Sequence, residues 1–436
     1  MIQFSARGLA PFWEIICFVA EILYQKVWQV LNFHLTLQNV LTEGEKSMNE
    51  LYKSKISQAV KYLNEFDIDS WIIFSSEGSD PAVQLLTGIN TVGRTCFIFT
   101  KSGERYALCS VIDAQESEES GLFDEVITYR NDLPEKLNLI LDAIKPKNIA
   151  LNYSLNDNLC DGLTVGRYRW LSKILGEKYK SRFVSSEPFL KKIRSIKTPA
   201  EIEKIKKAVD ITIEIYESVF KQLRAGLSEY EVGQIFIEEM KKRNVVSGVT
   251  KKLTMPIVMK ERIAHRAPGP AKIEPGDYLI MDFSVDYEGY VSDIARTVYF
   301  LREGETRAPK LMENSFKAAY DAITKAKEAI KPGMKGYEID KIARQHLLDC
   351  GMPEITHATG HQIGRLTHDG GTLLGPEWER YGTDVYGTIE ENMVFTLEPT
   401  ILRDDDYSIL VEENIVVTKD GAEFLSKRQE EIILIG

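Results

Sequence analysis

The sequence predicts an α/β (α+β) protein in two parts, of which the second contains a duplicated half. Short apolar strands alternate with helical segments up to about residue 189, and a helix start signal follows near residue 198. A motif near residue 224 then recurs near residue 331. Alternating helices and strands are typical of an α/β domain, and a repeat with the same order of elements indicates duplication.

The composition narrows the class of protein. The chain has 436 residues, 44% of them hydrophobic, and a net charge of −11. This length favours more than one domain, and the acidic charge disfavours nucleic acid or an anionic membrane as a partner. The five cysteines are scattered without a CxxC pair, which indicates reduced thiols in a cytoplasmic protein and argues against a cysteine metal site.

Residues 1–47 differ from the rest of the chain. Their apolar run, 9–24, is interrupted by Glu14 and Glu21, so it is a poor candidate for a membrane span or a signal peptide. We expect an extension that is absent from the natural protein, with translation starting at Met48, where the regular pattern begins. The alternative is a genuine anchoring or dimer-forming segment.

An amino-terminal domain is expected over residues 48–192. Its elements are an amphipathic helix, a buried strand, a strand hairpin and a further strand, at 51–66, 71–74, 96–100 with 105–108, and 149–152. Strands of this kind are short, apolar and bounded by turn residues. No cluster of polar residues in this domain indicates a catalytic site.

The second domain, 193–436, begins with a helix start signal. Thr198 can cap a helix, Pro199 suits its first turn, and Glu201 completes a capping box. Within this domain, residues 224–235 match residues 331–342. We therefore expect two similar halves that pack about a pseudo-two-fold axis with a cleft between them.

Each half contains an apolar strand hairpin with two acidic residues. Counting back from a turn at residues 287–289 places Asp282 nearly opposite Asp293, where cross-strand Cβ atoms are roughly 5 Å apart. Glu398 and Glu412 are likewise equally spaced about a turn, in the hairpin Met393–Thr418. Close carboxylates in an apolar sheet cannot all stay ionised without a cation. A single acid is usually a surface residue, but four acids placed alike in two halves indicate a site.

The histidines support the same site. Only six occur, and three of them, His357, His361 and His368, lie within one glycine-containing segment. Four carboxylates with one imidazole form an oxygen-rich ligand set, which suits Mn²⁺, and Co²⁺ or Zn²⁺ less selectively. Four negative charges match two divalent ions, which can share a bridging hydroxide as the nucleophile.

These residues closely resemble the motifs of the pita-bread metallopeptidases, which include aminopeptidase P, prolidase and their relative creatinase. The matching motifs are His265, Asp282, Gly289-Tyr290-Val291-Ser292-Asp293-Ile294-Ala295-Arg296-Thr297, His361, His368-Asp369, Glu398-Pro399 and Glu412. The resemblance is strong over 198–436 and weaker over 55–190. It implies a creatinase-like amino-terminal domain, a pita-bread catalytic domain and a homodimer.

The resemblance also implies a role for each site residue. The ligands of two metal ions would be Asp282, Asp293, His361, Glu398 and Glu412. Glu398 would also move protons between water and the leaving amine. His265, His357 and His368 would bind the substrate, and catalysis would involve His265, Glu398 and His368, with His368 stabilising charge at the scissile carbonyl.

Three positions depart from the family pattern. Ser284 and Thr400 replace usual glycines, which we interpret as tolerated backbone variation. Leu410 stands where proline-specific members usually carry an arginine, and Arg365 or Arg403 are candidates to compensate for it. The predicted function is hydrolysis of an Xaa-Pro peptide bond. The alternatives are a metal-dependent hydrolase of a small non-peptide amide, which Leu410 favours, and a non-catalytic binding module, which the complete ligand set disfavours.

Overall fold

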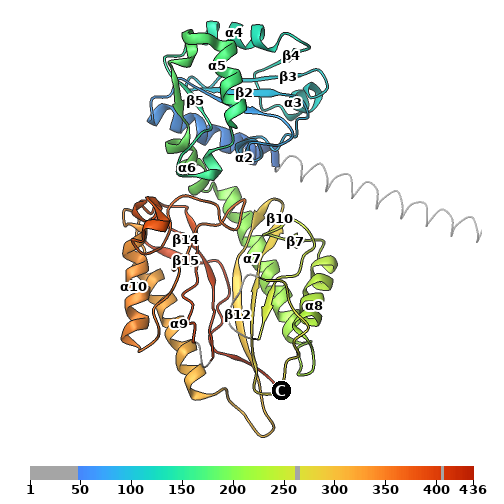
Figure 1. Ribbon diagram of the computed structural model, residues 1–436, viewed down its shortest axis with the longest axis vertical. Helices are drawn as coiled ribbons and strands as arrows, with labels where there is room; N and C mark the ends of the chain where they lie inside the picture. The colour runs from blue at the N-terminus through green and yellow to red at the C-terminus, as the bar shows by residue number, and fades with distance from the viewer. Residues whose placement is uncertain (1–47, 261–265, 404–406) are drawn as a thin grey trace, which may run out of the picture. The chain divides into compact units, whose positions relative to one another are not determined.

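The computed structural model describes residues 48–260, 266–403 and 407–436 (Figure 1). Residues 54–436 form one compact unit. The expected extension 1–47 and the substrate-binding candidate His265 lie outside the described residues. Within the described ranges, no helix has both the length and the apolar character needed to cross a membrane.

The first part of the compact unit is a six-stranded mixed sheet with the spatial order β4-β3-β2-β1-β5-β6. Its strands are β1 (Ser70–Ser75), β2 (Thr95–Thr100), β3 (Arg105–Ser110), β4 (Glu125–Tyr129), β5 (Ile149–Leu151) and β6 (Phe183–Ser185). The helical segments of this part are residues 54–65, α2 (Pro81–Leu86), α3 (Ala114–Ser120), α4 (Leu133–Ile144), η1 (Asn158–Cys160), α5 (Val165–Lys180) and α6 (Glu187–Ser195). Every residue of β1 and β2 is buried, as the apolar runs predict. The predicted helix, hairpin and strands are confirmed.

The predicted capping box opens the second part. The Thr198 hydroxyl accepts a hydrogen bond from the Glu201 backbone N–H, and the Glu201 carboxylate accepts one from the Thr198 N–H. These bonds satisfy donors that a helix start leaves unpaired. The compact unit spans both sides of residue 192, so the division into 48–192 and 193–436 stays a prediction.

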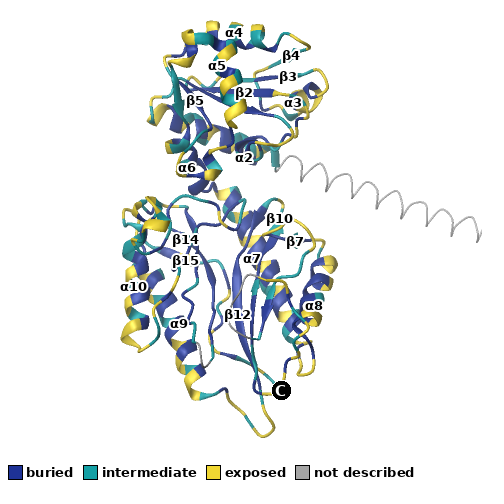
Figure 2. Ribbon diagram, viewed as in Figure 1, coloured by how far each residue is buried: buried dark blue, intermediate teal, exposed yellow. Residues whose placement is uncertain are grey.

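Three small sheets and four long helices are formed by the described residues of the second part. The helices are α7 (Pro199–Phe220), α8 (Glu229–Lys242), α9 (Lys310–Ala329) and α10 (Gly336–Asp349), with short turns η2 (Glu379–Tyr381) and η3 (Asp384–Tyr386). The first-half strands are β7 (Val246–Ser247), β8 (Ile257–Met259), β9 (Tyr278–Phe283), β10 (Val285–Tyr287), β11 (Tyr290–Val291) and β12 (Ile294–Phe300). The remaining strands are β13 (Val394–Leu397), β14 (Glu413–Val417), β15 (Ala422–Phe424) and β16 (Ile433–Ile435). The strands are largely buried, whereas α9 and α10 expose their outer faces (Figure 2).

The internal repeat is confirmed in backbone detail. Gly226 and Gly333 precede α8 and α10 with φ angles of 92° and 99°, a region that glycine enters without strain. The Gly226 N–H donates to the Ile273 carbonyl at 2.8 Å, and the Gly333 N–H donates to the Ile389 carbonyl at 2.8 Å. Two halves with the same turn and the same anchoring bond are duplicated units.

Candidate metal centre

The first hairpin places Asp282 and Asp293 near each other, with a register that differs from the expected one. Asp282 on β9 pairs with Ala295 on β12, two positions beyond Asp293. The expected three-residue turn, 287–289, would place Asp282 opposite residue 294, but the turn has only two residues, Glu288 and Gly289, so the register moves by one position. Both turn residues have positive φ angles. The two acids are therefore diagonal and not directly opposed neighbours.

Two side chains from elsewhere hold this hairpin. The Tyr216 hydroxyl, from α7, lies 2.9 Å from the Met281 carbonyl oxygen and 2.8 Å from the Ile294 carbonyl oxygen. The Asn414 side chain, from β14, accepts from the Asp293 N–H at 3.1 Å and donates to the Asp293 carbonyl at 2.5 Å. The backbone beside both aspartates is thereby fixed.

The second hairpin has the expected register. Leu397 pairs with Glu413 in the β13–β14 ladder, so the next pair along the same register is Glu398 with Glu412. The segment with His361 runs beside β13: the His361 N–H donates to the Thr396 hydroxyl at 3.1 Å, and the Thr396 N–H donates to the His361 carbonyl at 2.8 Å. The imidazole is thus delivered next to the two glutamates.

The two hairpins meet at their acidic ends. The Glu412 N–H donates to the Ala295 carbonyl at 3.2 Å, and Arg296 donates to the Glu412 carbonyl at 2.8 Å and to the Glu413 carboxylate at 3.1 Å. As a result, ligand-type atoms of Asp293, His361 and Glu412 lie within 4.8 Å of one another. The chain brings together one aspartate from the first half and a histidine and a glutamate from the second.

Glu398 and Asp282 belong to the same cluster. The Nε2 atom of His361 is 3.3 Å from Oε1 of Glu398 and 3.7 Å from Oδ2 of Asp293. Burial and the Asp282 carboxylate raise the pKa of Glu398 to about 8. Burial and the same carboxylate, followed by Glu398, raise the pKa of Asp293 well above its ordinary value. All five residues expected to bind metal are therefore near one another.

The pKa shifts in the cluster are those expected of a site that binds cations. Burial, together with the carboxylates of Asp293, Glu398 and Asp282, raises the pKa of Glu412 well above its ordinary value. Burial and His368 lower the pKa of His361 to about 3, so its imidazole is neutral and able to bind a metal ion. Buried carboxylates that repel one another, beside a neutral imidazole, are stabilised by divalent ions. The donor set fits the metal ions expected from the sequence.

The substrate-side histidines lie beside this cluster. The His368 ring is exposed, and its centroid is 4.4 Å from that of His361. His357 is partly buried, with Nδ1 2.7 Å from the Ala358 carbonyl oxygen, and burial lowers its pKa. Of these two histidines, His357 and His368, the ring of His368 is therefore the more exposed to solvent.

The departures from the family pattern have local partners. Ser284 donates to the Ser292 carbonyl at 2.5 Å, and Thr400 donates to the Glu398 carbonyl at 3.1 Å. Leu410 is 5% exposed and packs in an apolar cluster with Ile280 and Ala295. The position that the family pattern associates with an arginine therefore carries a buried apolar side chain, two residues before Glu412.

Sequence reasoning missed the residues that support the cluster. Neither Tyr216 nor Asn414 was among the residues expected at the site. Asn414 is a buried amide that precedes three apolar residues in its strand; a buried amide needs a hydrogen-bond partner, but the sequence does not show which residue that partner is.

The chain is similar to known proteins. Residues 203–419 match the model of metallopeptidase family M24. Over 340 residues, the chain is 29% identical to the candidate dipeptidase YkvY of Bacillus subtilis (strain 168), which covers 78% of this chain and 88% of that protein.

Solved structures share the fold. An X-Pro aminopeptidase from Thermotoga maritima MSB8 superposes with a TM-score of 0.69 and 23% identity, covering 87% of this chain and 99% of that chain. An Xaa-Pro dipeptidase from Bacillus anthracis gives a TM-score of 0.69 and 22% identity, covering 88% and 100%. The duplicated halves and the acidic cluster between them define a pita-bread hydrolase. Residues 203–419 belong to metallopeptidase family M24, which confirms the expected family and its peptidase class.

Proposed function

We propose that this protein is a metal-dependent Xaa-Pro peptidase of the aminopeptidase P or prolidase type. The observation that carries the proposal is the close approach of ligand atoms of Asp293, His361 and Glu412, with Asp282 and Glu398 beside them. The names of the structural neighbours, X-Pro aminopeptidase and Xaa-Pro dipeptidase, are in line with this substrate class.

Two divalent ions would be held by the five clustered residues, with Mn²⁺ as the first candidate and Co²⁺ or Zn²⁺ as alternatives. The positions of these residues support the proposal, because acids from both halves lie next to one imidazole. When bound, such ions would polarise the scissile carbonyl and supply a nucleophile at neutral pH.

The chain's own groups would handle the substrate and the protons. The Glu398 side chain is 22% exposed, so its carboxylate can take a proton from an attacking water and pass it to the leaving amine. His368, exposed beside His361, can donate a hydrogen bond to the substrate carbonyl as negative charge develops there. His265 and His357 would add substrate contacts.

A second candidate function rests on Leu410. Its apolar environment with Ile280 and Ala295 provides no guanidinium at the position where proline-specific relatives are expected to have one. This favours, as the alternative, hydrolysis of a small non-peptide amide by the same centre. We also propose a homodimer in the cytoplasm; the four described cysteines, which are all free, support a reducing compartment.

A substrate panel tests the proposal. Purified protein with added Mn²⁺ is assayed on Xaa-Pro dipeptides, longer Xaa-Pro peptides, Xaa-Ala controls and creatine. We expect cleavage before proline that a chelator abolishes. Cleavage of creatine alone would favour the amide hydrolase, and cleavage of nothing by a metal-loaded protein would contradict both.

Ligand variants test the metal assignment separately. Asp293→Asn and Glu412→Gln should each lower the metal content, because each removes a charged ligand. Glu423→Gln, an exposed acid on β15, is the matched control and should keep full content. Wild-type metal content and activity in both ligand variants would contradict the assignment.

A further inference from the structure

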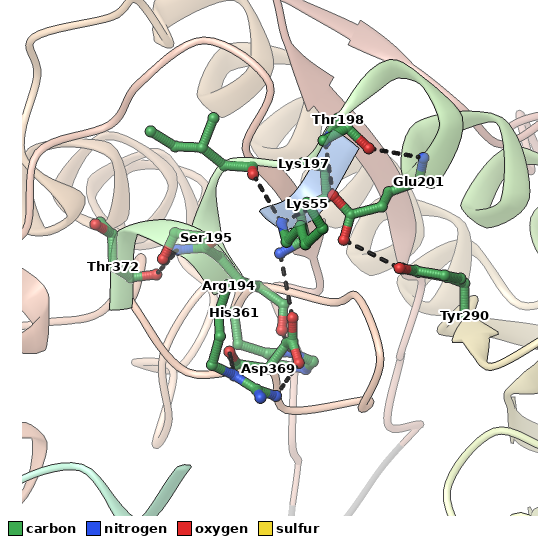
Figure 3. Close-up of polar contacts among 12 residues, drawn as sticks. Lys55, Arg194, Ser195, Lys197, Thr198, Glu201, Tyr290, His361, Asp369 and Thr372 are labelled. Carbon is green, nitrogen blue, oxygen red and sulfur yellow. Dashed lines mark hydrogen bonds and ion pairs between the residues drawn. The ribbon is translucent and has the colours of Figure 1, made fainter. Parts of the chain in front are cut away.

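Five charged side chains are buried together beside the loop that carries His368 (Figure 3). They are Lys55, Arg194, Lys197, Glu201 and Asp369, and none is more than 2% exposed. Lys55 comes from the helix that ends at residue 65, Arg194 from α6, Lys197 from the link to α7, and Glu201 from the first turn of α7. Only Asp369 belongs to the loop.

Both carboxylate oxygens of Asp369, its carbonyl and its N–H form hydrogen bonds. Its Oδ1 accepts from Arg194 at 2.5 Å, its Oδ2 accepts from Lys197 at 3.3 Å, and its carbonyl accepts from Arg194 at 3.4 Å. Its N–H donates to the Gln362 carbonyl at 2.9 Å, one residue after His361. Asp369 therefore ties the loop to the segment before α7 and to the segment that carries His361.

The same segment shapes the far end of the loop. Gly371 approaches Ser195 so closely that a Cβ atom would overlap the Ser195 hydroxyl. On its other side the loop meets the first hairpin, where the Val291 N–H donates to the Gly364 carbonyl at 2.9 Å and Arg365 lies over the Tyr290 ring at 4.8 Å. Residues 364–372 have no helix or strand of their own, so the loop that carries His368 depends on side-chain and backbone contacts such as these.

The charges themselves favour a positioning role over a stabilising one. Burial would raise the pKa of Asp369, but Arg194 and Lys197 outweigh it and lower that pKa. Burial lowers the pKa of Lys197 and of Lys55, although Asp369 and Glu201 oppose it. Apolar residues at a buried contact between two segments often stabilise the fold at least as well as buried ion pairs do. Directional ion pairs instead select one arrangement of the loop.

We propose that Asp369 is a positioning residue for His368. Arg194 and Lys197, its partners, lie before α7, so the segment that links the six-stranded sheet to α7 becomes part of what shapes the substrate side of the site. The inference rests on the proposed contact of His368 with the substrate. It requires neither Asp369 nor its cations to touch the substrate.

The test compares Asp369→Asn with Glu201→Gln. Both variants replace one buried carboxylate of the cluster by an amide and remove the counter-charge of a buried lysine, but only Asp369 belongs to the loop. We expect Asp369→Asn to keep its metal content and KM while kcat falls about 10–100-fold, since misplacement of a catalytic group by 1 Å has effects of this size. Glu201→Gln should lower the melting temperature and keep kcat.

Histidine NMR provides a readout independent of activity. The chain has six histidines, and the His368 signal is assigned by its absence in His368→Ala. We expect the His368 resonance to move or broaden in Asp369→Asn and to stay in place in Glu201→Gln. If the wild type cleaves no peptide, this comparison still tests the positioning, so the two proposals fail separately.

A second variant covers the case in which Asp369→Asn does not fold. In the double variant Asp369→Asn with Lys197→Met, the amide oxygen can still accept a hydrogen bond from Arg194. The Lys197 ammonium, which the amide N–H would otherwise oppose, is no longer present. We therefore expect a folded protein with kcat nearer the wild type and a His368 signal near its native position. A folded Asp369→Asn with the wild-type kcat and an unchanged His368 signal would overturn the proposal. So would a folded double variant whose His368 signal matches that of a denatured histidine while kcat is unchanged.

Discussion

Removing the metal should make the protein less stable as pH rises above 6.5. The relevant groups are Glu398, Asp293 and Glu412, whose pKa values in the metal-free fold are raised, that of Glu398 from 4.5 to about 8. An acid whose pKa is raised by folding binds its proton more tightly in the folded state. Its contribution to the free energy of unfolding is therefore present at low pH and is lost as pH rises through the folded pKa. The lowered pKa of His361 makes stability rise with pH, but only below pH 6.5, its ordinary pKa. Above that pH the imidazole is neutral in both the folded and the unfolded protein.

The magnitude follows from the same values. Each pKa unit corresponds to about 1.4 kcal/mol, so Glu398 alone removes about 2 kcal/mol of stability between pH 6.5 and about 8. Unfolding entropy of about 2.1 cal/mol/K per residue over roughly 380 residues converts this to a fall of about 2–3 °C in the apparent melting temperature. Asp293 and Glu412 act in the same direction.

Thermal unfolding at pH 6.5, 7.2 and 8.0, with chelator and with Mn²⁺, measures this effect. The metal-free protein should lose stability across the series, whereas bound cations favour the ionised acids and should flatten or reverse the trend. Glu412→Gln should weaken the trend in the metal-free protein. Identical pH dependence with and without metal would refute the reasoning.

Three substitutions test other parts of the account. His368→Ala should keep the metal content and lower kcat about 100–1,000-fold; a protein purified without metal would show that His368 is a ligand. Leu410→Arg should raise the preference for Xaa-Pro over Xaa-Ala and lower the melting temperature, since it places a guanidinium where a side chain is 5% exposed. An unchanged ratio in folded protein would place proline recognition elsewhere. Asn414→Ala should weaken metal affinity about 10–100-fold, as loss of a supporting hydrogen bond does, because it frees the Asp293 backbone; titration calorimetry measures this, and wild-type affinity would contradict it.

Local sequence rules predicted the elements that bring acids into the site. The capping box at Thr198 and the duplicated glycine turns depend only on neighbouring residues, and both are present. The spacing of Glu398 and Glu412 predicted their register correctly. The register of Asp282 was off by one position because the turn has two residues instead of three, and spacing alone does not determine the turn length.

Long-range partners could not be predicted in the same way. Asn414 bonds the backbone of Asp293, 121 positions earlier, and Arg194 pairs with Asp369, 175 positions later. Neither pair has a local periodicity, since each arises only when separate segments pack. The polar residues that hold the site in place are therefore visible in the fold and not in the sequence pattern.

The most direct test of the central claim is anomalous diffraction from crystals grown with Mn²⁺. The account predicts two manganese peaks about 3.5–4 Å apart, both within bonding distance of the acidic cluster and with Asp293 and Glu412 in contact with them. Two occupied sites formed by these residues would support a dinuclear centre. Manganese bound elsewhere, or a saturated crystal with no ion at Asp293, His361 and Glu412, would contradict it.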